Sequence, residues 1–64
     1  MNNTMKDRAF EIANKHGIDW VTKRIMDDTY IALNAHESET QRKMAKTRIK
    51  LFQEWLIEQS QSIK

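Results

Sequence analysis

The stretch Ala13-Asn14-Lys15-His16-Gly17-Ile18-Asp19 contains the only glycine of a 64-residue chain that has no proline. Many helices end at a residue in the left-handed conformation, which glycine adopts easily. For other residues the side chain makes this conformation costly. Ile18 can then fold back onto Ile12 or Ala13, as in a common helix ending. Asp19 is suited to cap a following helix. This stretch therefore predicts one break between two helices.

Cap residues predict the other helix ends. Thr4, followed by Asp7 in the first turn, is typical of a helix start. Ser38 with Gln41 three residues later has the pattern of a capping box. The expected helices cover residues about 5–16, 20–36 and 39–60. The sequence predicts one all-α domain over residues 1–64, a compact three-helix bundle with a long C-terminal helix.

Composition limits how this small domain is stabilised. The absence of cysteine excludes disulfides and thiolate zinc sites, so packing of helices has to stabilise the fold. Apolar runs of two or three residues are far shorter than the roughly 20 residues that cross a bilayer. No apolar N-terminal segment resembles a secretory signal. We expect no membrane association and a cytoplasmic location.

Apolar periodicity at 3.6 residues per turn predicts the core. The expected buried stripe of the second helix contains Val21, Ile25, Met26, Ala32 and Leu33, and that of the third contains Met44, Ala45, Ile49, Leu51, Phe52, Trp55 and Leu56. Leu51, Trp55 and Leu56 are expected to pack against the second helix. Ile57 projects outside this arc and Ile63 lies beyond the bundle. They are either ordinary exposed residues or contacts of a weak homodimer or a partner.

Catalytic and metal-binding constellations are missing from the sequence. Asp27 and Asp28 are adjacent, so their side chains point about 100° apart on a helix and are expected to pair with Lys23 and Arg24 instead. His16 and His36 are expected in the last turns of helices, where a cation is favourable. Neither has a second histidine or a cysteine nearby. We expect no enzyme activity, no cofactor and no metal.

The third helix carries a concentration of positive charge. Five basic residues fall within nine positions and no acidic residue interrupts them: Arg42, Lys43, Lys46, Arg48 and Lys50. Of these, Arg42, Lys46 and Lys50 are spaced i, i+4, i+8 and line one face, which is typical of phosphate binding. The alternative is a solvated face balanced by Glu37 and Glu39. Arg48 projects onto the apolar face, where its head is expected to reach Glu11 or Asp27.

Residues 11–25 look in their first half like a helix-turn-helix. Ala13, Gly17 and Ile18 stand where that motif places small, glycine and apolar residues. The second half departs from it, because the motif's apolar positions fall on Lys23 and Met26, whereas the periodic apolar residues are Val21 and Ile25. A plain helix ending explains Gly17 equally well.

These patterns leave two function hypotheses. The first is a small accessory or regulatory protein that contacts nucleic acid electrostatically through Arg42, Lys43, Lys46 and Lys50 on the third helix. The alternative is a protein-binding module, such as an inhibitor or assembly factor, that uses exposed aromatic and apolar residues of the second and third helices. Its expected contacts are Trp20, Tyr30 and Ile57.

Overall fold

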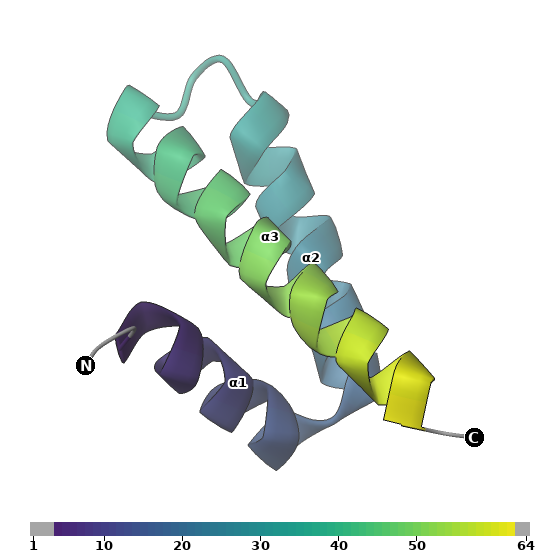
Figure 1. Ribbon diagram of the computed structural model, residues 1–64. Coiled ribbons are helices and arrows are strands. Elements are labelled where there is room, and N and C mark those ends of the chain that lie inside the picture. Colours follow the sequence, from purple (N-terminus) through teal and green to yellow (C-terminus); the bar gives the residue numbers. More distant parts are fainter. Residues whose placement is uncertain (1–3, 63–64) are drawn as a thin grey trace.

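The computed structural model describes residues 4–62 of the chain, and the side chains of residues 5–61. This part consists of three helices, α1 (Thr4–His16), α2 (Ile18–Leu33) and α3 (Glu39–Ser62) (Figure 1). The prediction of an all-α bundle with a long C-terminal helix is confirmed. The predicted cap at the Thr4 side chain and the position of Ile63 lie outside the described residues and side chains.

Gly17 alone separates α1 from α2. Its φ of 94° is positive, as predicted, and its ψ is 177°. Its N–H donates to the Ala13 carbonyl at 2.8 Å, and its own carbonyl accepts from the Val21 N–H at 3.1 Å. One residue therefore ends one helix and caps the next. This leaves no room for a helix-turn-helix, whose turn has roughly three to four residues.

Two details predicted for this break are wrong. Asp19 does not cap α2, because the helix already begins at Ile18 and Gly17 is its N-cap without a side-chain hydrogen bond. Ile18 does not fold back onto α1 to be buried, since it is 50% exposed. The reason is that the ψ of Gly17 lies far from the left-handed helical value of about 47° that such a helix ending requires.

The second connection begins earlier than predicted. α2 ends at Leu33, so His36 lies in the loop and not in a last helical turn. The Asn34 side-chain oxygen accepts the His36 N–H at 2.9 Å, and this local bond competes with continuation of the helix. Ser38 caps α3 as predicted, because its hydroxyl oxygen accepts the Gln41 N–H at 3.1 Å.

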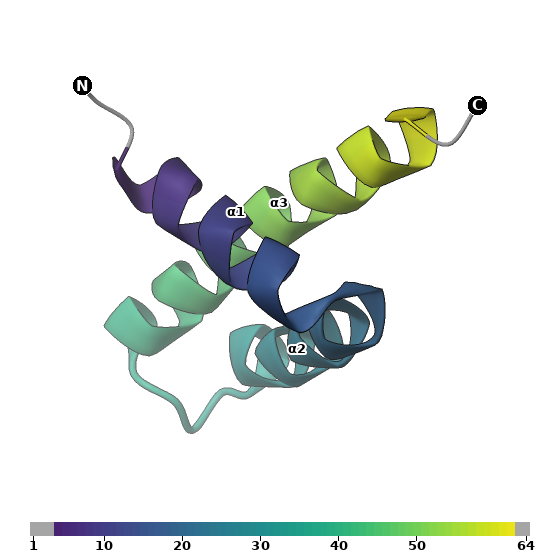
Figure 2. The same cartoon turned by 90° about the horizontal axis from the view of Figure 1, so that it is seen from below.

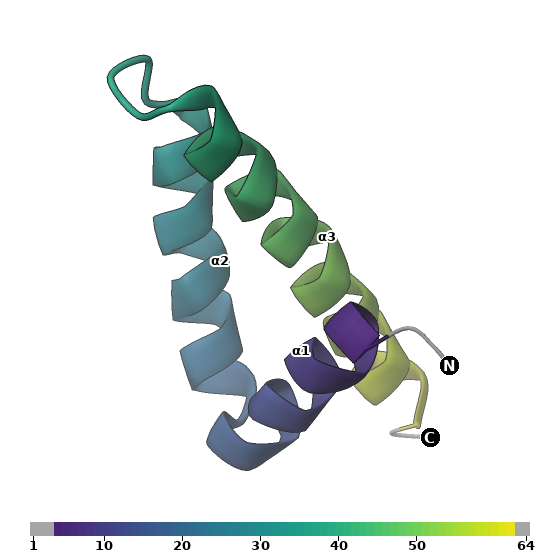
Figure 3. The ribbon, with the colours of Figure 1, turned by 90° about the vertical axis from the view of Figure 1, so that its left-hand side faces the viewer.

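The helices form two layers. α2 and α3 make the largest interface and run antiparallel as a hairpin, and α1 crosses one face of this hairpin near the end away from the loop (Figures 2 and 3). The shortest dimension of the molecule is 17 Å. Because α1 is the only other helix of residues 4–62, the opposite face of the hairpin carries no helix of this part of the chain.

A small core holds α1 against the hairpin. Its buried members are Ala9, Ala13, Val21, Phe52 and Trp55. The two alanines let α1 approach closely. The Trp55 indole N–H donates to the Asn14 side-chain oxygen at 2.9 Å. The Trp20 ring stacks on His16 at 4.4 Å and meets Phe52 edge-on at 5.9 Å.

The buried side of α2 differs from the predicted stripe. Met26 and Leu33 are 66% and 80% exposed, whereas Asp28 is completely buried. Asp28 follows Val21 by two turns and so shares its side of the helix. On α3, Leu51 and Trp55 face α1, because Leu51 lines a groove beside α1 and Trp55 bonds to Asn14. The expectation that both pack against the second helix was incomplete.

Asp28 is buried because it pairs with Arg48. The Arg48 Nε lies 3.2 Å from both carboxylate oxygens, and its Nη2 lies 2.9 Å from one of them. Arg24 adds a longer contact of 3.7 Å, as predicted from its i, i+4 spacing. The predicted acids for Arg48, Glu11 and Asp27, were wrong. A sequence projection of α3 alone does not reveal which acid of a neighbouring helix faces it, and the partner on α2 is Asp28, the neighbour of Asp27.

Candidate functional site

Four basic side chains of α3 remain free of internal ion pairs. Lys43, Lys46 and Lys50 are exposed and Arg42 is half-buried. Within residues 5–61 none of the four contacts a carboxylate, and the buried Nε of Arg42 has no acceptor there. Arg48 leaves the predicted cluster, because its guanidinium is bonded to Asp28. The remaining four are called the basic row below.

The basic row lies on the uncovered face of the hairpin. Trp55 marks the side of α3 that faces α1, since it bonds to Asn14. Lys46 precedes Trp55 by nine residues, which at about 100° per residue places the two on opposite sides of the helix. Arg42 and Lys50 lie about 40° to either side of Lys46 by the same rotation. The row therefore points away from α1, and Lys43 stands at its edge.

The predicted balancing acids do not neutralise this row. Glu37 lies half-buried in the loop and Glu39 is exposed in the first turn of α3. Within the described side chains neither forms an ion pair with a member of the row. The charge is therefore available to an outside partner.

Three large apolar side chains form an exposed apolar row on α2. Met26, Tyr30 and Leu33 follow one another at i, i+4, i+7 and are 66%, 72% and 80% exposed. The bond between Asp28 and Arg48 fixes the register of the antiparallel pair. Counting from it, Tyr30 lies level with Lys46 and Met26 lies level with Lys50. Around the α2 axis the three residues lie about 140–200° from Asp28, the side chain that meets α3, so the apolar row points away from α3.

The three residues predicted for partner binding are separated by the fold. Trp20 is half-buried and packs against the core, so little of its ring faces solvent. Tyr30 and Ile57 are 72% and 56% exposed. Ile57 follows Lys46 by eleven residues, which places it within about 20° of that residue around the α3 axis. It therefore extends the basic row with an apolar side chain.

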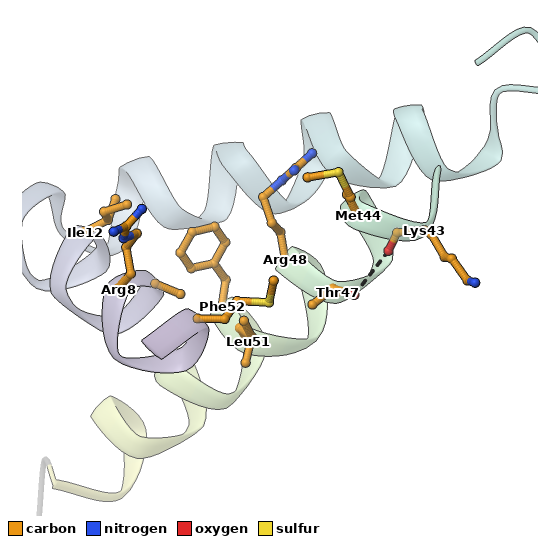
Figure 4. Close-up of a pocket in the computed structure, with 10 residues that line it drawn as sticks. Arg8, Ile12, Lys43, Met44, Thr47, Arg48, Leu51 and Phe52 are labelled. Carbon is orange, nitrogen blue, oxygen red and sulfur yellow. Dashed lines mark hydrogen bonds between the residues drawn. The ribbon is translucent and has the colours of Figure 1, made fainter. Parts of the chain in front are cut away.

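A second surface feature lies on the other side of α3. A groove of about 370 Å³ runs between the N-terminal halves of α1 and α3 (Figure 4). It is lined by Met5, Arg8, Ala9, Ile12, Lys43, Met44, Thr47, Arg48, Leu51 and Phe52. Sequence reasoning missed it, although each wall shows an apolar pair at i, i+7. Those pairs are Met5 with Ile12 and Met44 with Leu51.

Other side chains with chemical potential have structural contacts. The Thr29 and Thr47 hydroxyls donate to the carbonyls of Ile25 and Lys43, at 2.8 and 3.2 Å. Residues 4–62 contain no group of three or more histidine, cysteine or acidic residues able to hold a metal ion. Over the same residues, none of the helices combines the length and apolar character needed to traverse a bilayer.

Comparison with known protein families, curated proteins and solved structures finds no match to this chain. The function therefore has to be argued from the residues themselves.

Proposed function

We propose that this chain is a small accessory protein that binds nucleic acid through the basic row of α3, mainly by contacts to phosphate. The observation that carries the proposal is that Arg42, Lys43, Lys46 and Lys50 form no internal ion pair and lie on a face no described helix covers. Like charges spaced i, i+4 on a helix repel each other. A phosphate backbone removes that repulsion.

The dimensions of the row suit a phosphate backbone. Arg42 to Lys50 spans about 12 Å at 1.5 Å per residue. Duplex DNA carries one negative charge per roughly 1.7 Å of its axis, so several phosphates lie within reach of such a row.

A charge-reversal experiment tests this proposal. Lys46→Glu with Lys50→Glu removes two exposed cations of the row. Lys15→Glu with Lys23→Glu is the matched control, because these lysines are also exposed and lie on other surfaces. Both variants have the same net charge. Binding to labelled single-stranded and duplex DNA and RNA is measured by fluorescence anisotropy at several salt concentrations.

The row variant is expected to lose binding by about tenfold or more, with a smaller loss in the control. Its log–log salt slope on duplex DNA is expected to be shallower by about 1.8, at roughly 0.9 per lost phosphate contact. Absence of wild-type binding at low salt contradicts the proposal. An equal loss in both variants also contradicts it, because net charge alone then explains the effect.

The second candidate function is protein binding through the apolar row of α2. The exposure of Met26, Tyr30 and Leu33 at i, i+4, i+7 favours it, because this is the spacing of anchors that one helix offers another. An apolar interface of this kind keeps its affinity at high salt, whereas phosphate binding weakens steeply. A complex from source cells that resists both nuclease and salt, and is lost in Leu33→Ser, supports this alternative.

A further inference from the structure

The groove between α1 and α3 has two matching apolar walls. Met5 and Ile12 of α1 are 63% and 36% exposed, and Met44 of α3 is 47% exposed. In Figure 4, Ile12 and Met44 stand at opposite ends of the view, with Leu51 and Phe52 between them. Methionine side chains are flexible and adapt to different apolar partners. The walls therefore suit an apolar occupant and do not fix its detailed shape.

The charges around the groove are all of one sign. Arg8 from α1 and Lys43 from α3 line it, and within residues 5–61 neither forms an ion pair. The third basic residue there, Arg48, is bonded to Asp28. No carboxylate lines the groove. An occupant therefore gains from carboxylates placed beside its apolar side chains.

The spacing of the walls points to a helix as the occupant. Each apolar pair is separated by seven residues, or about 10.5 Å along its helix. The anchors of an amphipathic helix docked in a groove repeat at i, i+3 or i+4, and i+7, with the same rise. Pockets for small ligands bury most of the ligand surface. Here Met5 and Met44 remain about half exposed, which suits an elongated partner lying across them.

We propose that this groove docks an amphipathic helix of a partner protein, with apolar side chains on Met5, Ile12, Met44 and Leu51 and carboxylates facing Arg8 and Lys43. The groove shares Lys43 with the basic row, whereas Lys46 and Lys50 do not line it.

Selection from a displayed peptide library tests the proposal on the full chain. The library holds 20-residue helical peptides with leucine fixed at i, i+4 and i+7 and with random flanking positions. Enriched peptides are expected to carry aspartate or glutamate at the flanks. The best peptide is then titrated by fluorescence anisotropy against the wild type and against variants whose helicity is checked by circular dichroism.

Met44→Asp is expected to weaken the selected peptide about tenfold or more. Met26→Asp is the matched control, since it places the same charge at an exposed methionine on the other face, and it is expected to leave affinity unchanged. Arg8→Glu, at an exposed position, tests the charge without touching the apolar walls. It is expected to weaken the acidic peptide and to strengthen a copy with lysine flanks.

Several results overturn the proposal. They are a failure to enrich any peptide, enrichment without acidic flanks, and an equal loss of affinity in Met44→Asp and Met26→Asp. Sedimentation of the free chain adds a further one. A wild-type dimer that Met44→Asp converts to a monomer assigns the groove to a second copy and excludes the partner helix.

Discussion

The two faces of the α2–α3 hairpin differ in what covers them. On one face, Ala9 and Ala13 let α1 pack closely, and a hydrogen bond between Asn14 and Trp55 links α1 to α3. On the other face, no described helix lies over the basic row. The same α3 thus contributes to a core with one side and presents free cations with the other. The contrast separates residues kept for stability from residues available for binding.

The largest expected effect comes from the ion pair that lies inside the hairpin between these two faces. Arg48→Met removes the closer cation of the fully buried Asp28 carboxylate and leaves only Arg24, at 3.7 Å. Breaking a buried pair in this way typically costs about 3–5 kcal/mol, comparable to the total stability of a small domain. We expect this variant to be largely unfolded, as measured by circular dichroism during urea titration.

A double variant separates the pair from the packing around it. Arg48→Met combined with Asp28→Leu replaces both charges by apolar groups. Such replacements are often neutral or stabilising, so most of the lost stability is expected to return. If Arg48→Met alone unfolds at nearly the wild-type urea concentration, the Asp28 carboxylate is not held by Arg48.

The covered face is expected to tolerate larger side chains much less than the open face. Ala13 is fully buried where α1 meets the core, so Ala13→Leu forces α1 away and is expected to cost about 1–3 kcal/mol. Thr22→Leu, at an exposed position of α2, is the comparison. Its free energy of unfolding is expected to stay within about 0.5 kcal/mol of the wild-type value. Thermal unfolding of both variants measures the difference. Equal losses would mean that the two faces are not distinct in packing.

Gly17 decides on which face α1 lies. Its combination of φ 94° and ψ 177° is open essentially to glycine alone, at a cost of about 1–3 kcal/mol for other residues. An added Cβ meets no atom within 4 Å, so the expected loss in Gly17→Ala comes from the backbone. Chemical synthesis with D-alanine at this position should restore stability, because D-residues favour positive φ. An L-alanine variant as stable as the wild type would contradict this conformation.

Local signals predicted the end of α1 and the start of α3, whereas α2 was expected over about 20–36 and covers Ile18–Leu33. Gly17 and Ser38 act within one turn of chain, so the sequence located both breaks. On α2 the burial of Val21 agrees with the predicted stripe, but the burial of Asp28 could not be predicted, because only its bond with Arg48 makes it favourable. Predicting the groove requires the relative position of α1 and α3, which the sequence does not give. Only its two i, i+7 apolar pairs can be recognised in the sequence. The sequence also shows the basic row. It does not show that these cations form no internal ion pair or that they lie on the uncovered face of the hairpin.

The smallest expected effect is a gain in stability on the open face. Lys46 stands four residues from both Arg42 and Lys50, so Lys46→Glu turns two repulsive i, i+4 pairs into attractive ones. Each such pair changes helix stability by about 0.2–0.5 kcal/mol. We expect a gain of roughly 0.5–1 kcal/mol at low salt that disappears near 1 M salt, where the Debye length is about 3 Å. Urea titrations at both salt concentrations measure this gain, with Lys23→Glu as the control on α2.

Lys46→Glu is also expected to weaken nucleic-acid binding, so a side chain retained at a cost in stability would be one that serves binding. A loss of stability in Lys46→Glu, or a gain that persists at high salt, would contradict the view that these cations repel one another without an internal partner.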